Sequence, residues 1–398
     1  MDQGGVIRTS NILRRMKGGA FDITLASPAP ANHARYTADV ESACDHFLWW
    51  PELAPSRTRR IMALASHLPV AAAAEWSDAG RTVVRQALAD RPDVVVVDFP
   101  HTDVLMPSQI DVASVMFTHN VEAEIFERQL KRATGIWRLV LADQMRKMAR
   151  LERKCLSRYS TVIAVSDRDN EALTERYQLS RVATIGTGVD VDFYGFSPPE
   201  TATDPGTTGG TLVFVATMSW APNIDSVNFL LDDVFPLLLR VRPHIRAVII
   251  GRNPPAAIAE KISKRGLNVT LTGFVDDIRP YIAQSNVYVI PVFVGSGTRI
   301  KAYEAMAMGR PVVSTTIGME GLDVTDGENF LRADDAAEFA RCILMLLQDS
   351  SMCTRIAGAA RRLMEDRFSW YRVARQFETI CHGALSLGRV QYPTAEVA

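Results

Sequence analysis

The segment 295–314, GSGTRIKAYEAMAMGRPVVS, constrains the fold more than any other part of the chain. A loop of small residues leads into a helix-forming stretch, which stops at Gly309 and continues as the apolar segment Pro311–Ser314. This order of loop, helix, glycine and strand is typical of one repeat of a doubly wound α/β sheet. The segment therefore predicts a parallel sheet flanked by helices.

The charges at the start of this predicted helix are unusual. Arg299 and Lys301 stand where the backbone N–H groups already form a positive pole, a place that favours acidic residues. Two cations at that pole indicate that an anion binds to the loop, and phosphate is the commonest candidate. The alternative is that both side chains extend into water and that Lys301 pairs with Glu304 one helical turn later.

Short apolar segments alternate with amphipathic ones along the whole chain. The predicted strands cover about 21–26, 93–98, 112–117, 161–165 and 182–185 in the first half, and 211–217, 247–250, 269–272, 287–291 and 312–314 in the second. Helical periodicity separates most of them, including a long helix at about 136–157. The alternation predicts two α/β domains, each a doubly wound, Rossmann-like parallel sheet with helices on both faces.

The length and one irregular segment suggest how the domains divide. A chain of 398 residues is too long for one ordinary core. Residues 196–210 are rich in Pro, Gly and Thr and suit a linker, which leaves a first domain at 1–195 and a second at 211–368. Residues 369–388 form an amphipathic helix. The carboxyl ends of both sheets are expected to line a cleft for ligands.

The beginning of the chain departs from the doubly wound pattern. Such a domain usually starts with a strand, whereas this chain starts at Gly4-Gly5 and goes straight into a helix at about 7–16. We expect either that the first strand is absent or that an upstream segment was lost when the start was assigned. That strand would be central, so its absence would leave unpaired backbone edges in the core.

Composition excludes several classes of protein. A net charge of −1 gives no overall attraction to nucleic acid. No apolar run approaches the ~20 residues that span a bilayer, and the N-terminus has no apolar signal region. Five cysteines without a C-x-x-C pair predict reduced thiols in a cytoplasmic protein. The D-x-D at Asp190–Asp192 is interpreted as a turn, so no metal and no cofactor are expected.

A basic, partly apolar stretch follows in the long helix of the first half. Its cations are Arg138, Arg146, Lys147, Arg150, Arg153, Lys154 and Arg158, and its apolar residues are Leu139, Met145, Met148 and Leu151. One interpretation is a solvated helix face. The other is a peripheral contact with anionic headgroups on the inner face of the cytoplasmic membrane.

The segment GSGTRIKAYEAMAMGRPVV resembles the nucleotide-sugar signature of GT-B glycosyltransferases, specifically glycosyltransferase family 4. Further segments match in order: SNVYVIP at 285–291, VIAVS at 162–166, GTGVD at 186–190 and GMEGL at 318–322. The resemblance covers nearly the whole chain, loosely in the first half and closely in the second. It implies the GT-B fold and a last helix that crosses back to the first domain.

The resemblance also implies a donor site in the second domain for a nucleotide diphosphate sugar of the UDP or GDP type. Breaking the glycosyl–phosphate bond leaves charge on the diphosphate, which cations and helix-end N–H groups stabilise. Arg299, Lys301 and the N–H groups of Gly297 and Thr298 are the candidates for this role. Glu304 would accept hydrogen bonds from the ribose hydroxyls.

Other site residues follow from the same resemblance. Gly273, Phe274 and Val275 would flank the base, and Gly251 and Arg252 end a strand on the same side of the cleft.

In the first domain, His119 would face the donor sugar and stabilise charge at the reacting centre; the alternative is a capping or packing histidine. Gly4 and Gly5 match a glycine-rich loop that approaches the donor phosphate and the acceptor, as only glycine permits; the alternative is an ordinary flexible terminus.

The activity implied is retaining, metal-independent transfer of a hexosyl group to a glycan or lipid-linked acceptor in cell-surface polysaccharide synthesis. The family motif has two glutamates, but Ser296 stands at the first position. Residues 217–223 also lack the cations that many relatives have after the corresponding strand, so Arg299 and Lys301 are expected to hold the diphosphate. Alternatives are a nucleotide-sugar-binding GT-B protein with impaired catalysis and a GT-B sugar-nucleotide epimerase.

Overall fold

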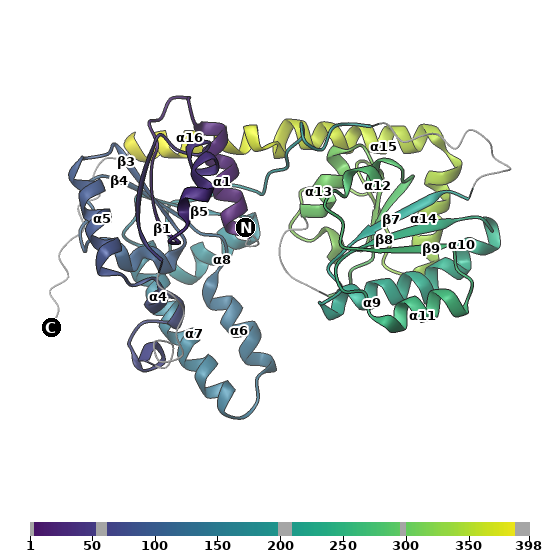
Figure 1. Cartoon of the computed structure of the whole chain (residues 1–398), viewed down its shortest axis with the longest axis horizontal. Helices are drawn as coiled ribbons and strands as arrows, with labels where there is room; N and C mark the ends of the chain where they lie inside the picture. Colours follow the sequence, from purple (N-terminus) through teal and green to yellow (C-terminus); the bar gives the residue numbers. More distant parts are fainter. Residues whose placement is uncertain (1–3, 53–61, 198–208, 295–299, 387–398) are drawn as a thin grey trace. The chain divides into compact units, whose positions relative to one another are not determined.

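The computed structural model describes residues 4–52, 62–197, 209–294 and 300–386. The chain forms two compact units: residues 1–186 with 373–398 make unit 1, and residues 187–372 make unit 2. Each unit combines a parallel sheet with surrounding helices (Figure 1). The α/β class predicted from the sequence is confirmed.

Unit 2 contains the regular sheet. In chain order its elements are β7 (Thr211–Val215), α9 (Ala221–Phe229), a π-helical turn (Leu230–Val234), α10 (Phe235–Val241), β8 (Arg246–Ile250), α11 (Ala256–Lys264), β9 (Val269–Gly273), α12 (Arg279–Ala283), β10 (Val287–Ile290), α13 (Ile300–Ala307), β11 (Val312–Ser314), β12 (Leu331–Arg332), α14 (Ala336–Gln348) and α15 (Ser350–Leu363). The described strands are all parallel and lie in the order β12-β11-β10-β7-β8-β9.

The apolar strand runs of unit 2 are explained by burial on both faces of this sheet. Leu212 and Phe214 of β7 belong to one hydrophobic core, which α9, α10 and α14 complete. Val213 and Val215 alternate with them and belong to a second core, which α12, α13 and α15 cover. A strand buried on both faces needs apolar side chains in successive positions, and the residues LVFV after Thr211 meet that need.

Unit 1 is built from two separate parallel sheets. In chain order its elements are α1 (Gly4–Met16), β1 (Thr24–Ala29), α2 (Thr37–Glu41), β2 (His46–Pro51), α4 (Val70–Glu75), α5 (Asp78–Ala89), β3 (Val94–Asp98), β4 (Ala113–Phe117), α6 (Glu122–Arg132), α7 (Gly135–Leu156), β5 (Thr161–Ala164), α8 (Asp167–Tyr177), β6 (Val182–Thr184) and α16 (Trp370–Ser386). Strands β3-β4-β5-β6 form one sheet and β1-β2 the other. Among the described residues, no strand connects these two sheets.

Three features of unit 1 differ from those predicted. The first strand lies three residues later than expected, at β1, and β2 was not predicted at all. Helix α1 starts at Gly4, so Gly4 and Gly5 lie in its first turn and not in a loop. The helical geometry replaces the loop because the sequence that follows, VIRTSNILRRM, continues an amphipathic helix without interruption.

The division between the units also comes earlier than the predicted linker at 196–210. Residues 187–195 belong to unit 2 because they pack against its last helices. The N–H of Val189 donates to the carbonyl of Phe368, and the N–H of Trp370 donates to the carbonyl of Val189. A Cβ on Gly188 would lie 2.4 Å from the Trp370 ring, so only glycine allows this contact. Residues 198–208 of the predicted linker lie outside the described residues.

Helix α16 is the expected amphipathic C-terminal helix. Its first residues group with unit 2, and from Val373 onward it groups with unit 1. In unit 1 it packs through Phe377, whose ring lies 5.6 Å from that of Phe117 on β4. The ring of His382 lies 4.8 Å from that of Phe21.

Candidate functional site

The strand order of unit 2 places a topological switch between β7 and β10. From β7 the chain builds the sheet outward through β8 and β9, and it then returns to the other side of β7 with β10 and β11. Loops that leave neighbouring strands in opposite directions open a crevice at the carboxyl ends, where ligands of such sheets bind. Lys301 and Glu304 lie on α13, the helix that follows β10.

Lys301 reaches the end of the central strand. Its Nζ donates a hydrogen bond to the carbonyl oxygen of Val215, the last residue of β7, at 3.2 Å. Burial lowers the pKa of Lys301, and the nearby Glu304 carboxylate acts in the opposite direction. A buried ammonium group beside a helix N-terminus lacks the water and the negative pole that would favour its charge. The position is therefore well suited to an anionic ligand.

Glu304 lies one turn further along α13, among tyrosines. Its Oε1 accepts a hydrogen bond from the hydroxyl of Tyr194 at 2.9 Å. Burial raises the pKa of Glu304, whereas the bond from Tyr194 and the charge of Lys301 lower it. The hydroxyl of Tyr288 on β10 is buried and has no hydrogen-bond partner among the described residues. The sequence did not point to either tyrosine, because Tyr288 sits in an apolar strand run and Tyr194 in a turn.

The predicted base-flanking residues meet at the ends of β8 and β9. The N–H of Gly251 donates to the carbonyl of Gly273 at 3.0 Å. A Cβ on Gly251 would lie 1.7 Å from the carbonyl oxygen of Ala216, so a larger residue is excluded there. The guanidinium of Arg252 lies over the ring of Phe274 at 4.2 Å, and 57% of Phe274 is exposed.

These two side chains present a flat aromatic and cationic surface to the solvent. Val275, by contrast, packs against the hydrophobic core.

The loop before α13 lies outside the described residues. It contains Ser296, Gly297, Thr298 and Arg299, so the expected contacts of these residues with a diphosphate stay predictions.

In unit 1, His119 follows β4 and is almost fully buried, with 2% of its side chain exposed. Its Nε2 lies 2.5 Å from Oδ1 of Asp98, and its Nδ1 lies 2.9 Å from a terminal nitrogen of Arg8. Because arginine can only donate, Nδ1 accepts its hydrogen bond and Nε2 carries the proton that goes to Asp98. Both ring nitrogens therefore contact protein groups. The ring is enclosed in unit 1, and its expected contact with a donor sugar stays a prediction.

Asp98, at the carboxyl end of β3, is more accessible to solvent than His119 and Arg8. A third of its side chain, 33%, is exposed, and its Oδ2 accepts a hydrogen bond from the hydroxyl of Thr9 at 2.9 Å. Burial lowers the pKa of Arg8 to about 10, and the charge of Asp98 opposes this shift. The sequence analysis missed Asp98, although an aspartate that ends the apolar run DVVVVD is a recognisable signal.

Aromatic rings enclose the imidazole. The rings of Phe99 and Phe117 lie 4.2 and 4.4 Å from that of His119. Phe99 has a φ of +68°, a strained value for a residue with a side chain, at the turn that follows Asp98. A Cβ on Gly5 would lie 2.4 Å from Cζ of Phe99 and 2.9 Å from Cγ of His119. Gly5 therefore allows close packing of α1 on these rings, a role different from the predicted phosphate loop.

His101 lies next to this group. Its ring is tilted by 35° against that of Phe99, with the ring centroids 5.1 Å apart, and its buried Nδ1 has no hydrogen-bond partner among the described residues. Burial lowers the pKa of His101 to about 4, whereas the charge of Asp98 acts in the opposite direction.

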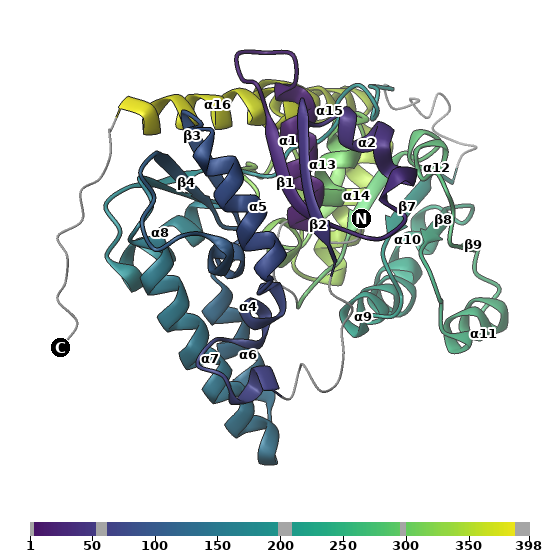
Figure 2. The same cartoon turned by 60° about the vertical axis from the view of Figure 1, so that its left-hand side comes forward.

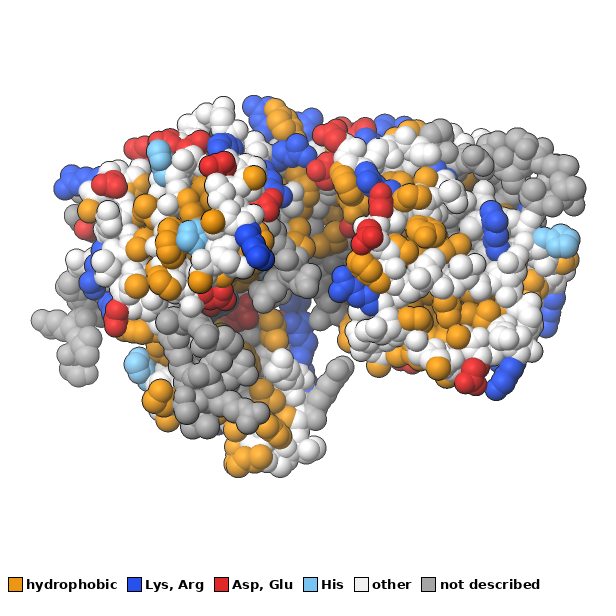
Figure 3. Space-filling view, viewed as in Figure 1, with side chains coloured by type: hydrophobic (Ala, Val, Ile, Leu, Met, Phe, Trp, Pro, Cys, Tyr) orange, Lys and Arg blue, Asp and Glu red, His pale blue; other side chains and the backbone are white. Residues whose placement is uncertain are grey.

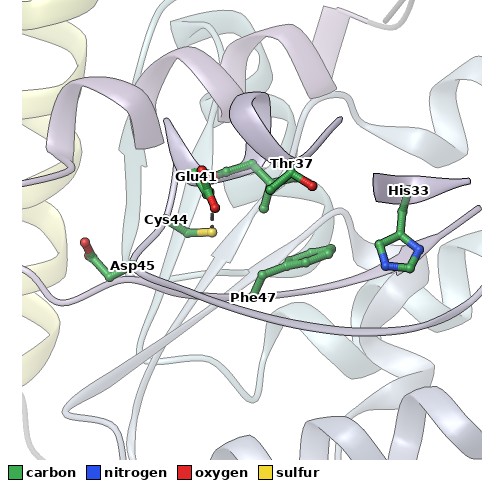
Figure 4. A pocket seen from close by; sticks show the side chains of 7 residues that line it. His33, Thr37, Glu41, Cys44, Asp45 and Phe47 are labelled. Atoms are coloured by element: carbon green, nitrogen blue, oxygen red, sulfur yellow. Dashed lines mark hydrogen bonds between the residues drawn. The ribbon is translucent and has the colours of Figure 1, made fainter. Parts of the chain in front are cut away.

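A hollow on unit 1 lies apart from the predicted site residues (Figure 4). It is lined by His33, Thr37, Val40, Glu41, Cys44, Asp45 and Phe47. The Cys44 thiol donates to the carbonyl of Val40 at 3.3 Å, and burial raises the pKa of this thiol. These observations describe an unreactive thiol.

The described part of the chain contains no group of three or more His, Cys, Asp or Glu side chains placed to hold a metal ion. None of its helices combines the length and the apolar character that a membrane span requires.

Comparison with known families accounts for both units. The family described as Glycosyltransferase Family 4 matches residues 4–193, and the family described as Glycosyl transferases group 1 matches residues 209–349. The chain belongs to the group 1, family 4 glycosyltransferases of the GT-B type. The two matches follow one another along the chain, as the two domains of such a protein do.

Curated relatives of this family match over part of their length. Phosphatidyl-myo-inositol mannosyltransferase from Mycobacterium leprae is 28% identical over 55% of this chain and 59% of its own length. An uncharacterized 44.6 kDa protein in the cps region of Klebsiella pneumoniae is 24% identical over 41% of this chain and 43% of its own. The chain thus spans about half the length of these relatives.

Solved structures of the GT-B fold match over nearly the full chain. Sucrose-phosphate synthase from Thermosynechococcus elongatus has a TM-score of 0.64 at 15% identity, over 96% of this chain and 93% of its own. Anabaena Alr3699/HepE in complex with UDP has a TM-score of 0.65 at 16% identity, over 96% of this chain and 97% of its own. At this identity the likeness concerns the fold alone, and the predicted GT-B fold is confirmed.

Proposed function

We propose that this protein transfers a hexosyl group, with retention of configuration, from a nucleotide diphosphate sugar to a glycan or lipid-linked acceptor. The observation that carries the proposal is the Lys301 ammonium, which contacts the end of β7 at the switch point of the sheet. A cation there can neutralise the charge that develops on a departing diphosphate. Retention follows from the family resemblance.

The donor is assigned to unit 2. We assign its diphosphate to Lys301, to Arg299 and to the N–H groups of Gly297 and Thr298. Glu304 uses one carboxylate oxygen for Tyr194 and has the other for a ribose hydroxyl. The exposed surface made by Phe274 and Arg252 stacks on the base, which a flat aromatic ring with a cation suits.

In unit 1, we assign a role in binding the donor sugar to the cluster of Asp98, His119 and Arg8. Because both nitrogens of His119 contact protein groups, we assign the contact with the sugar to Asp98. His119 and Arg8 then act as positioning residues, which fix the orientation and the charge of that carboxylate.

Names of the relatives support the acceptor class. One relative is the phosphatidyl-myo-inositol mannosyltransferase described above, and another is GDP-mannose:cellobiosyl-diphosphopolyprenol alpha-mannosyltransferase from Xanthomonas oryzae, 28% identical over 58% of this chain. The first name includes the lipid phosphatidyl-myo-inositol, and the second includes a sugar linked to diphosphopolyprenol. The Klebsiella relative is described as a protein in the cps region. We therefore place the protein in cell-surface polysaccharide synthesis, in the cytoplasm and at the inner face of the membrane.

Calorimetry with UDP, GDP and ADP tests the donor site. Replacing Lys301 by Met keeps most of the side-chain volume and removes the charge. Because a charge-assisted hydrogen bond contributes about 1.5–3 kcal/mol, K301M should weaken nucleotide diphosphate binding roughly 10- to 150-fold. The matched control is K264M, since 77% of the Lys264 side chain is exposed and its pair is Glu260 on the same helix. Equal affinities of K301M and wild type would refute the assignment.

Transfer assays with UDP-, GDP- and ADP-sugars then separate the alternatives. Ser296, at the place of a family glutamate, favours a protein that binds the donor without transfer. That alternative predicts nucleotide binding with no turnover on any donor or acceptor extract. An epimerase would interconvert the sugar nucleotides with no acceptor present.

A further inference from the structure

Helices α6 and α7 form an antiparallel hairpin on unit 1. They pack side by side along their length and are joined by a short connection at 133–134 (Figures 1 and 2). We call residues 128–142, which include this connection, the hairpin tip. The side chain of Arg132 lies outside the described residues and is counted here from the sequence alone.

The hairpin tip exposes large apolar side chains. Ile136, Leu139 and Trp137 are 70%, 69% and 67% exposed, and no other large hydrophobic residue in the described chain exceeds these values. Ile136 and Leu139 are three positions apart on α7 and so share one helix face. Figure 3 shows hydrophobic side chains gathered over the end of this hairpin, at the bottom of the view. Exposed apolar residues that cluster in this way mark an interaction surface.

The charges of the tip are all of one sign. It contains Arg128, Lys131, Arg132 and Arg138 and has neither Asp nor Glu. The tip also contains the N-terminus of α7, whose unpaired N–H groups add partial positive charge. The whole chain has a net charge of −1, so this local excess is not a general property of the protein.

Further along α7, several residues of the basic stretch contact other parts of unit 1. Met148 and Leu151 point into a hydrophobic core of unit 1. Lys147 pairs with Asp143 at 2.7 Å, and Arg158 lies 3.6 Å from Asp103. Only the start of α7 combines free apolar side chains with cations.

We propose that the hairpin tip docks on an anionic lipid surface. Its cations attract acidic headgroups, and each cation that lies near the membrane surface adds to the binding free energy. Trp137 suits the headgroup region, and Ile136 and Leu139 enter the acyl boundary beside it. A lipid surface matches the tip better than a protein partner because its negative charge is uniform and complements a tip of one sign. This inference rests on the proposed location at the membrane.

Vesicle co-sedimentation of the full chain tests the proposal, with phosphatidylcholine alone and with phosphatidylcholine–phosphatidylglycerol mixtures. We expect binding only to the anionic vesicles, and its loss at high salt. A triple variant, I136S/W137A/L139S, should reduce partitioning at least about tenfold. Replacing Arg138 by Gln should reduce it roughly fivefold, as expected for one charge near the surface. The tryptophan emission of the wild type should shift to the blue on binding, and that shift should be smaller in W137A.

The matched controls are V241S and K264Q, which change exposed residues of unit 2. Both should bind vesicles like the wild type. Absence of binding, or equal binding by the triple variant, would overturn the proposal. So would a tip that mediates self-association without lipid, detected by analytical ultracentrifugation. Thermal unfolding followed by circular dichroism on the same samples shows whether each variant is folded. Calorimetry with nucleotide diphosphates, which we assign to unit 2, separates a failure of this inference from a failure of the donor site.

Discussion

Replacement of Gly5 by Ala tests whether the aromatic cluster around His119 is as tightly packed as the distances imply. The new Cβ would lie 2.4 Å from Cζ of Phe99, whereas ordinary contacts begin at 3.4 Å, so the ring must retreat by about 1 Å. That ring lies 4.2 Å from His119 and 5.1 Å from His101, on a backbone with a φ of +68°. It therefore cannot move without disturbing both imidazoles.

The expected size follows from two opposing effects. Overpacking of a core costs about 1–3 kcal/mol, and the better helix propensity of alanine returns at most ~1 kcal/mol. Together these effects give a net loss between about 0 and 3 kcal/mol in the free energy of unfolding of unit 1, and we expect the middle of this range, about 1–2 kcal/mol. At 2–4 °C per kcal/mol for a unit of this size, the melting temperature should fall by about 2–8 °C.

Thermal unfolding followed by calorimetry measures this loss, with Gly383→Ala as the matched control. Gly383 lies in α16, also in unit 1, and a Cβ there meets no heavy atom within 4 Å. Because only helix propensity changes, the control should be stabilised by up to about 1 kcal/mol. Equal stabilisation of both variants would show that α1 does not pack on Phe99 and His119 as described.

Two further predictions concern His101 and Phe274. The pKa of His101 is about 4 in the folded protein and 6.5 ordinarily, so its contribution to stability is present above pH 6.5 and is lost as the pH falls toward 4. Between pH 7 and pH 4 the wild type should lose about 3 kcal/mol more than His101→Phe in urea unfolding, and parallel pH profiles would contradict this. Phe274→Ala should weaken binding of UDP or GDP by roughly 1–3 kcal/mol in calorimetry but leave inorganic diphosphate unaffected, because the exposed ring is assigned to the base. An equal loss for both ligands would place Phe274 elsewhere in the site.

The architecture of unit 2 could be predicted because its signals are local. Each apolar run, such as TLVFV, is buried on both faces of the sheet and so differs clearly from the helices around it. Gly309, with a φ of +70°, ends α13 where the sequence predicts a helix stop. The unusual charge of Lys301 is also visible within one segment, but its contact with β7 is not, because Val215 lies 86 positions away in the chain.

Unit 1 was harder to predict because its strands carry weaker patterns. Strand β2, HFLWWP, contains a histidine and ends in proline, and several of its residues are only half-buried. An edge of this kind lacks both the continuous apolar run of a central strand and the strict alternation of an exposed one. Its partner β1, TLASPA, is equally irregular, so neither run is distinctive without the parallel pairing that joins them.

The contacts of Lys301 and His119 both depend on residues that are distant in the chain. Lys301 lies in the first turn of α13, which the local sequence predicts, but its Nζ contacts Val215, 86 positions away. What His119 does is set by Asp98 and Arg8, which are 21 and 111 positions away in the chain. Those contacts fix the tautomer of the imidazole, bury the ring and make Asp98 the exposed group. The family resemblance identifies the histidine, whereas our proposal that the neighbouring carboxylate contacts the sugar rests on these tertiary contacts.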